Sequence, residues 1–504
     1  MYLKPNLLAA LLMAGTPLSA QTPDALERSL RNIQYMAEAQ GTVSDNRAPL
    51  WLTANRYGLS SIEAPNGLLR VQITSNPERD SLANWRIGYG ADIAAALNFT
   101  SNVVIQQLYA DIDYKLVRLT LGAKEESMAF KNRLLSSGGQ TFGINARPVP
   151  QVRIGLPQYW NISGKGKWAA IRGFISYGIM TDGRFQSGYV SPNQTYARKA
   201  LLHSKAGYLK LGNEEKFPLT FEGGLEMATV FGGTVYNALT WEGVQASPIH
   251  MSSGIKDFIN ATLGIGGDVT DGEGYSNATG NTLGSWLFRL NYKGKGWSAG
   301  IYYDHFFEDH SQMFLDYGWY DGLAGLEVNL PANRFVSTVV YEFLNTTYQS
   351  GPVYHDRTET IPDQISGVDN YYNHNLYPGW QHWGNAIGNP LFISPLYNDN
   401  GSLTFTGNRF KAHHVGIVGL PIPHLAYRIL YTYERSLGTY AVPFENARTT
   451  HSMLAEFEYS PRKIGDWELD GWHVKLAFAM DRGKLLGNNT GFQLGISKTG
   501  VFSR

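Results

Sequence analysis

WLFRLNYKGKGWSAGIYYD, residues 286–304, is the stretch that decides the fold. Within residues 286–292 every second side chain is apolar, and the side chains between them include an arginine and an asparagine. A tight Lys-Gly-Lys-Gly turn follows at 293–296, and the alternation then resumes over 297–303. Successive side chains of a β-strand point to opposite faces of the sheet, so this stretch predicts a β-hairpin with one apolar and one polar face.

The same two-residue period recurs toward the C-terminus, over residues 335–343, 427–434, 472–480 and 492–499. The apolar face carries tyrosine and tryptophan near the strand ends, and the other face carries charged, amide or small side chains. Lipid outside, a polar lumen inside and aromatics at both interfaces are typical of a membrane β-barrel. A soluble sandwich would instead place Lys and Glu on its outer face. Because a sheet edge cannot remain unpaired in hydrocarbon, we expect closure.

Short and long connections alternate along the chain, as in outer-membrane barrels with short periplasmic turns and long outer loops. The pattern predicts an all-β transmembrane antiparallel barrel of about 18 strands, with both termini in the periplasm. The two longest loops, about 230–284 and 346–409, are expected on the cell exterior. One turn has little turn chemistry and is placed at Asp111-Ile112-Asp113.

The N-terminal region predicts an exported protein. Residues 1–20 combine Lys4, a short apolar run and Leu18-Ser19-Ala20, which is the pattern of a removed signal peptide. Residues 21–48 are expected to form a periplasmic segment with one short amphipathic helix from Thr22-Pro23-Asp24 to about Gln40. The barrel itself is predicted over residues 49–504.

Composition excludes several classes of protein. The 504 residues carry 42 basic and 42 acidic side chains, and this balance argues against nucleic-acid binding. The sequence contains no cysteine, so lipoprotein anchoring and disulfides are excluded, and a metal site would need histidines and carboxylates alone. We predict no metal and no cofactor.

The segment of residues 367–392 is the candidate binding site. It is dense in aromatics, amides and histidines, and its glycines and prolines predict an ordered loop. Flat rings beside hydrogen-bonding groups suit a sugar. The stacking candidates are Tyr371, Tyr372 and Trp380, and the hydroxyl-binding candidates are Asp369, Asn370, Asn373, His374 and His382. The alternative is a loop whose rings pack only against their own scaffold.

A second loop holds His305, Glu308, Asp309 and His310. The histidines stand five residues apart, which does not match the spacing of a helical His-Glu-x-x-His metal site. We therefore expect a network that braces the loop and serves as a secondary binding surface, through His305, Asp309 and His310. No catalytic residue is predicted. The Gly- and Asp-rich stretch 264–274 does not match an EF-hand calcium loop.

Several short motifs resemble the capsule-assembly Wzi family of outer-membrane β-barrel proteins, in the form found in Bacteroides-like bacteria. They are Asn55-Arg56-Tyr57-Gly58, Gly122-Ala123-Lys124-Glu125, Asn145-Ala146-Arg147-Pro148-Val149-Pro150, His305 with Glu308-Asp309-His310-Ser311, Asp369-Asn370-Tyr371-Tyr372-Asn373-His374, Tyr377-Pro378-Gly379-Trp380 and Ile387-Gly388-Asn389-Pro390-Leu391.

The resemblance implies an eighteen-stranded barrel in a Gram-negative outer membrane, closed by a helical element at its periplasmic end. It also implies a lectin-like, non-enzymatic exterior that binds and helps attach or assemble capsular or surface polysaccharide. The partners implied are that polysaccharide, outer-membrane lipid and the polysaccharide export machinery.

The alternative function is a substrate-selective oligosaccharide porin, since a barrel of this size can enclose an aqueous lumen. Eight inward charges would line such a channel: Arg289, Glu342, Arg428, Glu434, Glu456, Glu458, His473 and Lys475. These charges could equally form a network that rigidifies the barrel and blocks passage. The residue pattern leaves both possibilities open.

Overall fold

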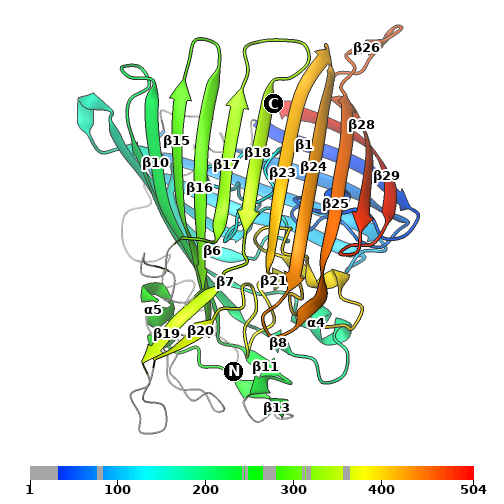
Figure 1. The fold of residues 1–504 in the computed structure, drawn as a ribbon. Helices are drawn as coiled ribbons and strands as arrows, with labels where there is room; N and C mark the ends of the chain where they lie inside the picture. Colours follow the sequence, from blue (N-terminus) through cyan, green and yellow to red (C-terminus); the bar gives the residue numbers. More distant parts are fainter. Residues whose placement is uncertain are drawn as a thin grey trace.

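The computed structural model describes residues 32–76, 83–240, 243–244, 248–264, 280–308, 313, 319–355 and 364–503. Eighteen strands form one antiparallel sheet that closes on itself as a barrel (Figure 1). The barrel strands are β1 (Asn32–Ser44), β2 (Asn66–Ser75), β3 (Trp85–Leu97), β4 (Val103–Tyr114), β5 (Val117–Ala123), β6 (Gln151–Asn161), β7 (Ala169–Ile179), β9 (Leu201–Leu211), β10 (Leu219–Phe231), β15 (Asn281–Lys293), β16 (Ser298–Glu308), β17 (Gly322–Asn329), β18 (Thr338–Asn345), β23 (Phe410–Ile422), β24 (Leu425–Gly438), β25 (Pro443–Tyr459), β28 (Trp472–Gly483) and β29 (Asn489–Ser503).

Closure joins the first and last strands. Strand β1 pairs with β2 on one side and with β29 on the other, where Asn32 lies opposite Ser503. Each remaining barrel strand pairs with the next one along the chain, which is the simplest way to satisfy every backbone group in a membrane. The predicted all-β barrel of about 18 strands is therefore confirmed.

The predicted assignment of outward- and inward-facing side chains is also confirmed. On the hairpin formed by β15 and β16, Leu290 and Ile301 are exposed on the outer face. Arg289 points inward, where its guanidinium lies 2.9 Å from the Glu327 carboxylate. Most outward side chains of this hairpin are apolar, and the inward ones include charged and hydrogen-bonded residues, as lipid and lumen require.

Short turns gather at one end of the barrel and long connections at the other (Figure 1). The described chain ends at the short-turn end, where Figure 1 marks the C-terminus. Asn32, the first described residue, pairs with Ser503 and therefore lies at the same end. The long-loop end carries the helices α3 (Leu50–Thr53), α4 (Gly183–Tyr189) and α5 (Ile255–Leu263), the 3-10 turn η4 (Pro395–Tyr397) and the small strands β8 (Tyr196–Arg198), β11 (Thr234–Tyr236), β12 (Leu239–Thr240), β13 (Gly243–Val244), β14 (Ile249–His250), β19 (Ser350–His355), β20 (Gln364–Val368), β21 (Gln381–His382) and β22 (Asn385–Ala386). The short-turn end carries the 3-10 turn η2 (Gly164–Gly166), β26 (Lys463–Ile464) and β27 (Trp467–Glu468). No helix among the described residues is both long and apolar enough to cross a membrane.

Two local predictions are wrong. The helix expected to reach Gln40 is instead strand β1 from Asn32 onward, because the edges of β2 and β29 both need a partner there. Residues 1–31, with the predicted signal peptide and the helix start, lie outside the described residues. The turn placed at residues 111–113 lies inside β4, and the chain turns at Lys115, whose φ is 52°. Asp111 and Asp113 point inward, where Arg118 binds both of them.

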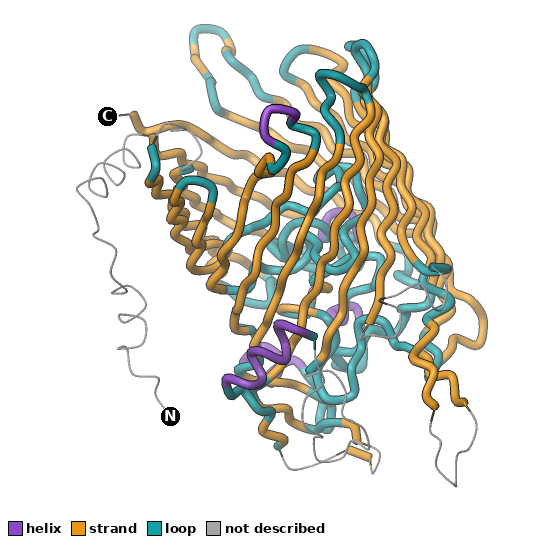
Figure 2. Tube along the Cα trace, turned by 90° about the vertical axis from the view of Figure 1, so that its left-hand side faces the viewer, coloured by secondary structure: helices purple, strands orange, loops and turns teal. Residues whose placement is uncertain are grey.

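The lumen is not empty. Three connections from the long-loop end, residues 45–65, 124–150 and 369–409, fold back between the barrel walls, where Figure 2 shows loops inside the sheet. Together they bring the largest buried aromatic and aliphatic side chains into one cluster. We call these three connections the plug.

Candidate functional site

The plug is fastened first to the wall formed by β16, β17 and β18. The hydroxyl groups of Ser136 and Ser137 donate to Glu342 of β18 at 2.6 and 2.5 Å. Near them Asn132 donates to Glu327 of β17 at 3.1 Å, and Lys131 forms an ion pair with Asp304 of β16. Residues 124–150 thus leave β5 and reach strands far away around the barrel.

Residues 45–65 fasten the plug to the neighbouring wall formed by β24, β25 and β28. The backbone nitrogen of Leu50 donates to Asp481 of β28 at 3.1 Å, and the indole nitrogen of Trp51 donates to Thr432 of β24 at 3.2 Å. Arg56 forms an ion pair with Glu456 of β25 at 2.8 Å. Buried charge-assisted bonds of this kind fix geometry, because breaking one partner leaves the other unpaired.

Residues 369–409 fill the space between these two attachments. Trp380 is 1% exposed, and its indole nitrogen donates to the Thr141 carbonyl oxygen at 3.1 Å. Tyr371 donates to Asp321 at 3.1 Å. Tyr372 donates to the Gln140 carbonyl oxygen, and its ring stacks on Phe392 at 4.0 Å.

The burial of these rings contradicts the prediction that Tyr371, Tyr372 and Trp380 stack on a sugar. All three are enclosed, and their polar atoms are hydrogen-bonded within the protein. The aromatic density of residues 367–392 has another physical cause: a wide barrel needs large side chains to fill its lumen at the density of a protein core. The alternative of a self-packing loop is correct for these rings.

Most candidates for hydroxyl recognition are also buried or hydrogen-bonded within the protein. Asn370 is exposed, but its side-chain oxygen accepts from Asn408 at 2.6 Å and from Asn373 at 3.0 Å. Asp369 is largely buried, and His374 and Asn373 are half-buried.

His382 is buried within the plug. Its Nδ1 lies 2.8 Å from the Arg147 carbonyl oxygen, and its Nε2 lies 3.1 Å from the Thr181 hydroxyl. A carbonyl can only accept, so Nδ1 carries the proton and Nε2 accepts from Thr181. His382 thus joins residues 124–150 to the segment before α4 as a neutral imidazole.

His305 braces a loop, as expected, but the prediction that it also contributes to a binding surface is wrong, because it is fully buried. It points outward from β16 and is fully buried, with its ring stacked on Trp319 at 4.7 Å and its Nδ1 3.1 Å from the Asp321 carbonyl oxygen. Glu308 accepts from the backbone nitrogen of Tyr372 at 2.5 Å, which ties this strand to the plug. Asp309, His310 and the stretch 265–279 lie outside the described residues. Among the residues that are described, no group of three or more histidine and acidic side chains could hold a metal ion.

A group of stacked, partly accessible rings lies elsewhere, at the long-loop end. Phe185 and Tyr189 of α4 and Trp383 of the β21–β22 hairpin are half-buried. The Phe185 ring stacks on Tyr189 at 5.3 Å and on Trp383 at 5.6 Å. We call these three rings the aromatic ledge. The guanidinium of Arg147 lies 4.5 Å from the Trp383 ring.

Local geometry fixes the ledge. Trp383 adopts a left-handed backbone with φ of 57°, and its backbone nitrogen donates to Asp182 at 3.0 Å. The Tyr189 hydroxyl donates to the Pro395 carbonyl oxygen at 3.0 Å, which ties α4 to η4. The sequence prediction missed these residues. The available signal was the four-residue spacing of Phe185 and Tyr189, which puts both rings on one helix face, but nothing in the sequence joins them to Trp383.

Burial shapes the electrostatics beneath the ledge. It lowers the pKa of Arg147 to about 10, partly offset by the Asp182 carboxylate, so Arg147 stays a cation at neutral pH. It also lowers the pKa of His374 to about 4, and that of His382 below its ordinary value. Both histidines are therefore neutral at neutral pH, and Arg147 is the fixed positive charge under the Trp383 ring.

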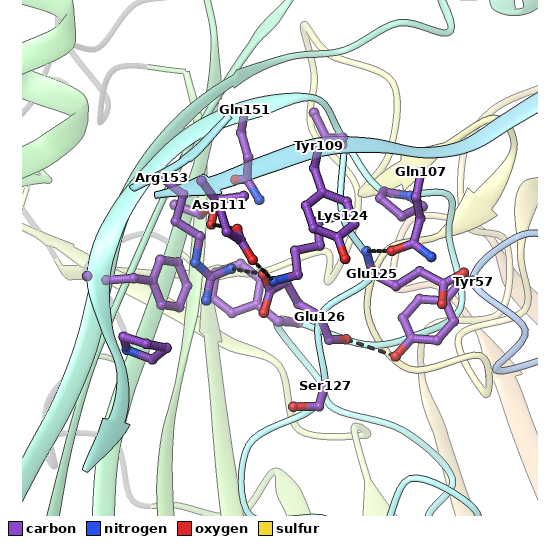
Figure 3. A pocket seen from close by; sticks show the side chains of 18 of the residues that line it. Tyr57, Gln107, Tyr109, Asp111, Lys124, Glu125, Glu126, Ser127, Gln151 and Arg153 are labelled. Atoms are coloured by element: carbon purple, nitrogen blue, oxygen red, sulfur yellow. Dashed lines mark hydrogen bonds and ion pairs between the residues drawn. The ribbon is translucent and has the colours of Figure 1, made fainter. Parts of the chain in front are cut away.

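A polar cavity of about 780 Å³ lies in the lumen on the short-turn side of the plug (Figure 3). It extends from Thr74, near the short-turn end of β2, to Trp380 in the plug. Lys124 pairs with Asp111 at 2.6 Å, and Arg153 lies 3.8 Å from Glu126. The cavity therefore presents mostly paired charges.

The other predicted lumen charges point inward, and all but Glu434 are engaged in the same way. Arg428 pairs with Glu456 at 3.0 Å, Lys475 lies 3.3 Å from Glu458, and His473 lies near that same carboxylate. Glu342 is bound by the plug, and Glu434 is fully buried. Together with the pair of Arg289 and Glu327, these contacts agree with the alternative in which the lumen charges form a network that rigidifies the barrel.

Comparison with known proteins gives a fold. No protein-family model matches the sequence, and no curated protein sequence matches it. The chain is similar to the solved structure of Wzi, an outer-membrane protein involved in group 1 capsule assembly in Escherichia coli and described as a carbohydrate-binding β-barrel. The identity is 13%, the TM-score is 0.55, and the match covers 97% of this chain and 91% of that one.

Porin structures resemble it less. OprD of Pseudomonas aeruginosa is 8% identical with a TM-score of 0.45, covering 94% of this chain and 95% of that one. A BenF-like porin from Pseudomonas fluorescens Pf-5 is 8% identical with a TM-score of 0.46, covering 94% and 98%. Likenesses at such identities extend to the fold alone: the chain is an eighteen-stranded antiparallel β-barrel of the outer-membrane type.

Proposed function

We propose that this protein binds surface polysaccharide at its long-loop end and helps to hold it on the cell, with no bond made or broken. The observation that carries the proposal is the aromatic ledge, three stacked and accessible rings at the rim of a barrel whose lumen is plugged. The similarity to a barrel described as carbohydrate-binding supports the same class of ligand. The long-loop end is taken to face the cell exterior.

The chemistry of the ledge suits a sugar polymer. The partly exposed rings of Phe185, Tyr189 and Trp383 can contact the apolar faces of pyranose units. Arg184 and Thr181 are exposed beside them and can hydrogen-bond hydroxyl or carboxylate groups. One ring-stacking contact is worth about 1–3 kcal/mol, so a single site would be weak. A repeating polymer that engages many barrels gains avidity without any new contact.

The plug favours retention over passage. Residues 124–150 run from β5 across the lumen to β18, residues 45–65 are fastened to β24, β25 and β28, and buried side chains of residues 369–409 fill the space beside them. We therefore expect no steady single-channel conductance from the purified protein in a planar bilayer. An oligosaccharide porin would conduct, so a stable open channel in the unmodified protein would favour the porin function.

The test of binding is the retention of purified polysaccharide by cells that carry ledge variants. Trp383→Ala and Phe185→Ala should each lower single-site affinity about five-fold or more, the equivalent of at least 1 kcal/mol. Trp467→Ala is the matched control, because Trp467 is 78% exposed but lies in the β26–β27 hairpin at the opposite end. Heat-modifiable migration on gels checks that each barrel folds. If both ledge variants retain polymer as well as the control does, the ledge is not the binding surface.

A further inference from the structure

Helix α5 lies outside the barrel, against the outer wall near the long-loop end, where Figure 2 shows a helix in front of the strands. The Tyr177 hydroxyl of β7 donates to the Phe258 carbonyl oxygen at 2.9 Å. The Phe258 ring packs on Tyr177 at 5.0 Å and on Phe231 of β10 at 5.2 Å. Lys205 of β9 donates to the Thr262 carbonyl oxygen. The helix thus covers the outer faces of three neighbouring strands.

The amphipathic character of α5 is inverted relative to that of a helix on a soluble protein. Its buried residues are Asp257, Asn260 and Ala261, which face the wall. Its outward stripe is apolar: Ile255, Ile259 and Leu263 are 83%, 51% and 61% exposed. Their spacing of four residues places them along one side of the helix. A helix surrounded by water turns such a stripe toward the protein, whereas a helix in hydrocarbon turns it outward.

The register of the sheet places α5 beside lipid-facing strand residues. Tyr177 and His203, which it covers, stand in one cross-strand row with Val152 of β6 and Leu121 of β5. Val152 and Leu121 are exposed apolar residues on the outer face. The stripe of α5 therefore continues an apolar surface that already meets the membrane on the neighbouring strands.

The strands beneath the helix explain why it is needed there. Lys205 and His203 occupy outward positions, and a lysine facing lipid costs about 2–4 kcal/mol near the bilayer midplane. The carbonyl at the C-terminal end of α5 accepts the Lys205 ammonium hydrogen bond, and that end of a helix carries partial negative charge. His203 is fully buried on this face. The helix hides these polar groups and replaces them with isoleucine and leucine.

We propose that α5 lies within the hydrocarbon layer of the membrane, where it completes the lipid-facing wall over β7, β9 and β10 and contacts acyl chains through Ile255, Ile259 and Leu263. The 231–281 connection is thereby anchored in the membrane at the side of the barrel. Lys256 borders the stripe, and its long side chain can carry its charge to the lipid headgroups. This inference does not rest on the polysaccharide proposal.

The absence of cysteine from the sequence allows a direct test. Single variants Ile259→Cys, Ile429→Cys and Trp467→Cys place one environment-sensitive fluorophore on α5, on the outer wall of β24 or in the exposed β26–β27 hairpin. The labelled proteins are reconstituted in phospholipid vesicles, with acyl-brominated lipid as the membrane quencher and iodide as the aqueous quencher. Heat-modifiable migration confirms that each labelled barrel is folded.

We expect the label at position 259 to be quenched by brominated lipid nearly as strongly as the label at 429. Its quenching by iodide should be several-fold weaker than at 467. A ratio of lipid to iodide quenching closer to that at 467 would place α5 in water and overturn the proposal. Protection from both quenchers would also overturn it, because a protein surface, such as a second copy of the chain, would then cover the stripe.

Discussion

Glu342, on the inner face of β18, accepts two hydrogen bonds from Ser137, one from the backbone nitrogen at 2.7 Å and one from the hydroxyl at 2.5 Å. The two residues are joined across the lumen, since Ser137 belongs to the connection that follows β5. Glu342 also accepts from Ser136 and from Tyr302, each at 2.6 Å. This carboxylate is therefore a principal attachment of the plug to the barrel wall.

The first prediction is that Glu342→Ala loosens the plug. The change leaves buried donors of Ser136, Ser137 and Tyr302 without an acceptor, at about 1–3 kcal/mol for each group left unsatisfied. We expect a lower unfolding temperature and intermittent conductance in planar bilayers. Glu458→Ala is the control, because Glu458 is half-exposed and lies within 3.6 Å of His473 and 3.3 Å of Lys475, both on β28, rather than contacting the plug. Unchanged stability together with a silent bilayer recording would show that this attachment does not hold the plug.

The second prediction tests the pleat with two adjacent residues of β2. Val71 is exposed in an outer row with Ile93 and Ile105, and Gln72 lines the lumen cavity. Val71→Arg should cost about 2–4 kcal/mol near the bilayer midplane. Gln72→Arg should cost less, because the new cation enters a hydrated cavity beside Asp92. The measurement is unfolding in urea from lipid vesicles, and equal losses for the two variants would contradict the assigned faces.

The third prediction concerns orientation. Asn400 is exposed at the long-loop end, and Lys295 is exposed in the β15–β16 turn at the other end. We expect a membrane-impermeant maleimide to label Asn400→Cys on intact cells that lack capsule. Lys295→Cys should be labelled only after the outer membrane is permeabilised. The opposite pattern would place the ledge in the periplasm and remove the basis for polysaccharide binding at the cell surface.

The fourth prediction is that acid loosens the hairpin β21–β22. His382 must be neutral to accept from Thr181, and burial lowers its pKa, as it lowers that of His374 to about 4. The ordinary histidine pKa is about 6.5, so the unfolded chain takes up protons first as the pH falls. The contribution of these two neutral histidines to stability is complete above about pH 6.5 and is lost progressively as the pH falls below it.

Hydrogen exchange of residues 380–386, corrected for the intrinsic pH dependence of exchange, measures this effect. The β28–β29 pair serves as an internal reference. Opening of the hairpin should become more frequent as the pH falls below about 6.5. His382→Gln should flatten the response, since an amide oxygen can accept from Thr181 at any pH. A pH response in the glutamine variant equal to that of the unmodified chain would exclude His382 as its source.

Alternation along single strands made most of the barrel predictable. The inner and outer faces assigned to residues 286–304 are correct, because the alternation of side chains within each strand indicates which face meets lipid. The helix predicted up to about Gln40 is wrong because that segment fits both a helical and a strand periodicity. Ile33 and Met36 fit a helix face, but the chain there also alternates, and only the unpaired edges of β2 and β29 make it a strand.

The candidate site could not be predicted in the same way, because it depends on what fills the lumen. Trp380 and Trp383 are three residues apart in one aromatic segment, and only the fold separates them: Trp380 donates to Thr141 inside the plug, whereas Trp383 stacks with Phe185 at the rim. No local pattern brings Phe185 to Trp383, nearly 200 residues later.

The sequence by itself determined the class of protein and the inner and outer faces of the strands. These follow from local rules, since a strand in a membrane must show apolar side chains to lipid at every second position. The tertiary structure alone decided that three loops fold into the lumen, that Glu342 and Asp481 hold them, and that α5 turns its apolar stripe away from the barrel. Loop infolding and helix placement depend on contacts between residues hundreds of positions apart, which side-chain periodicity does not encode.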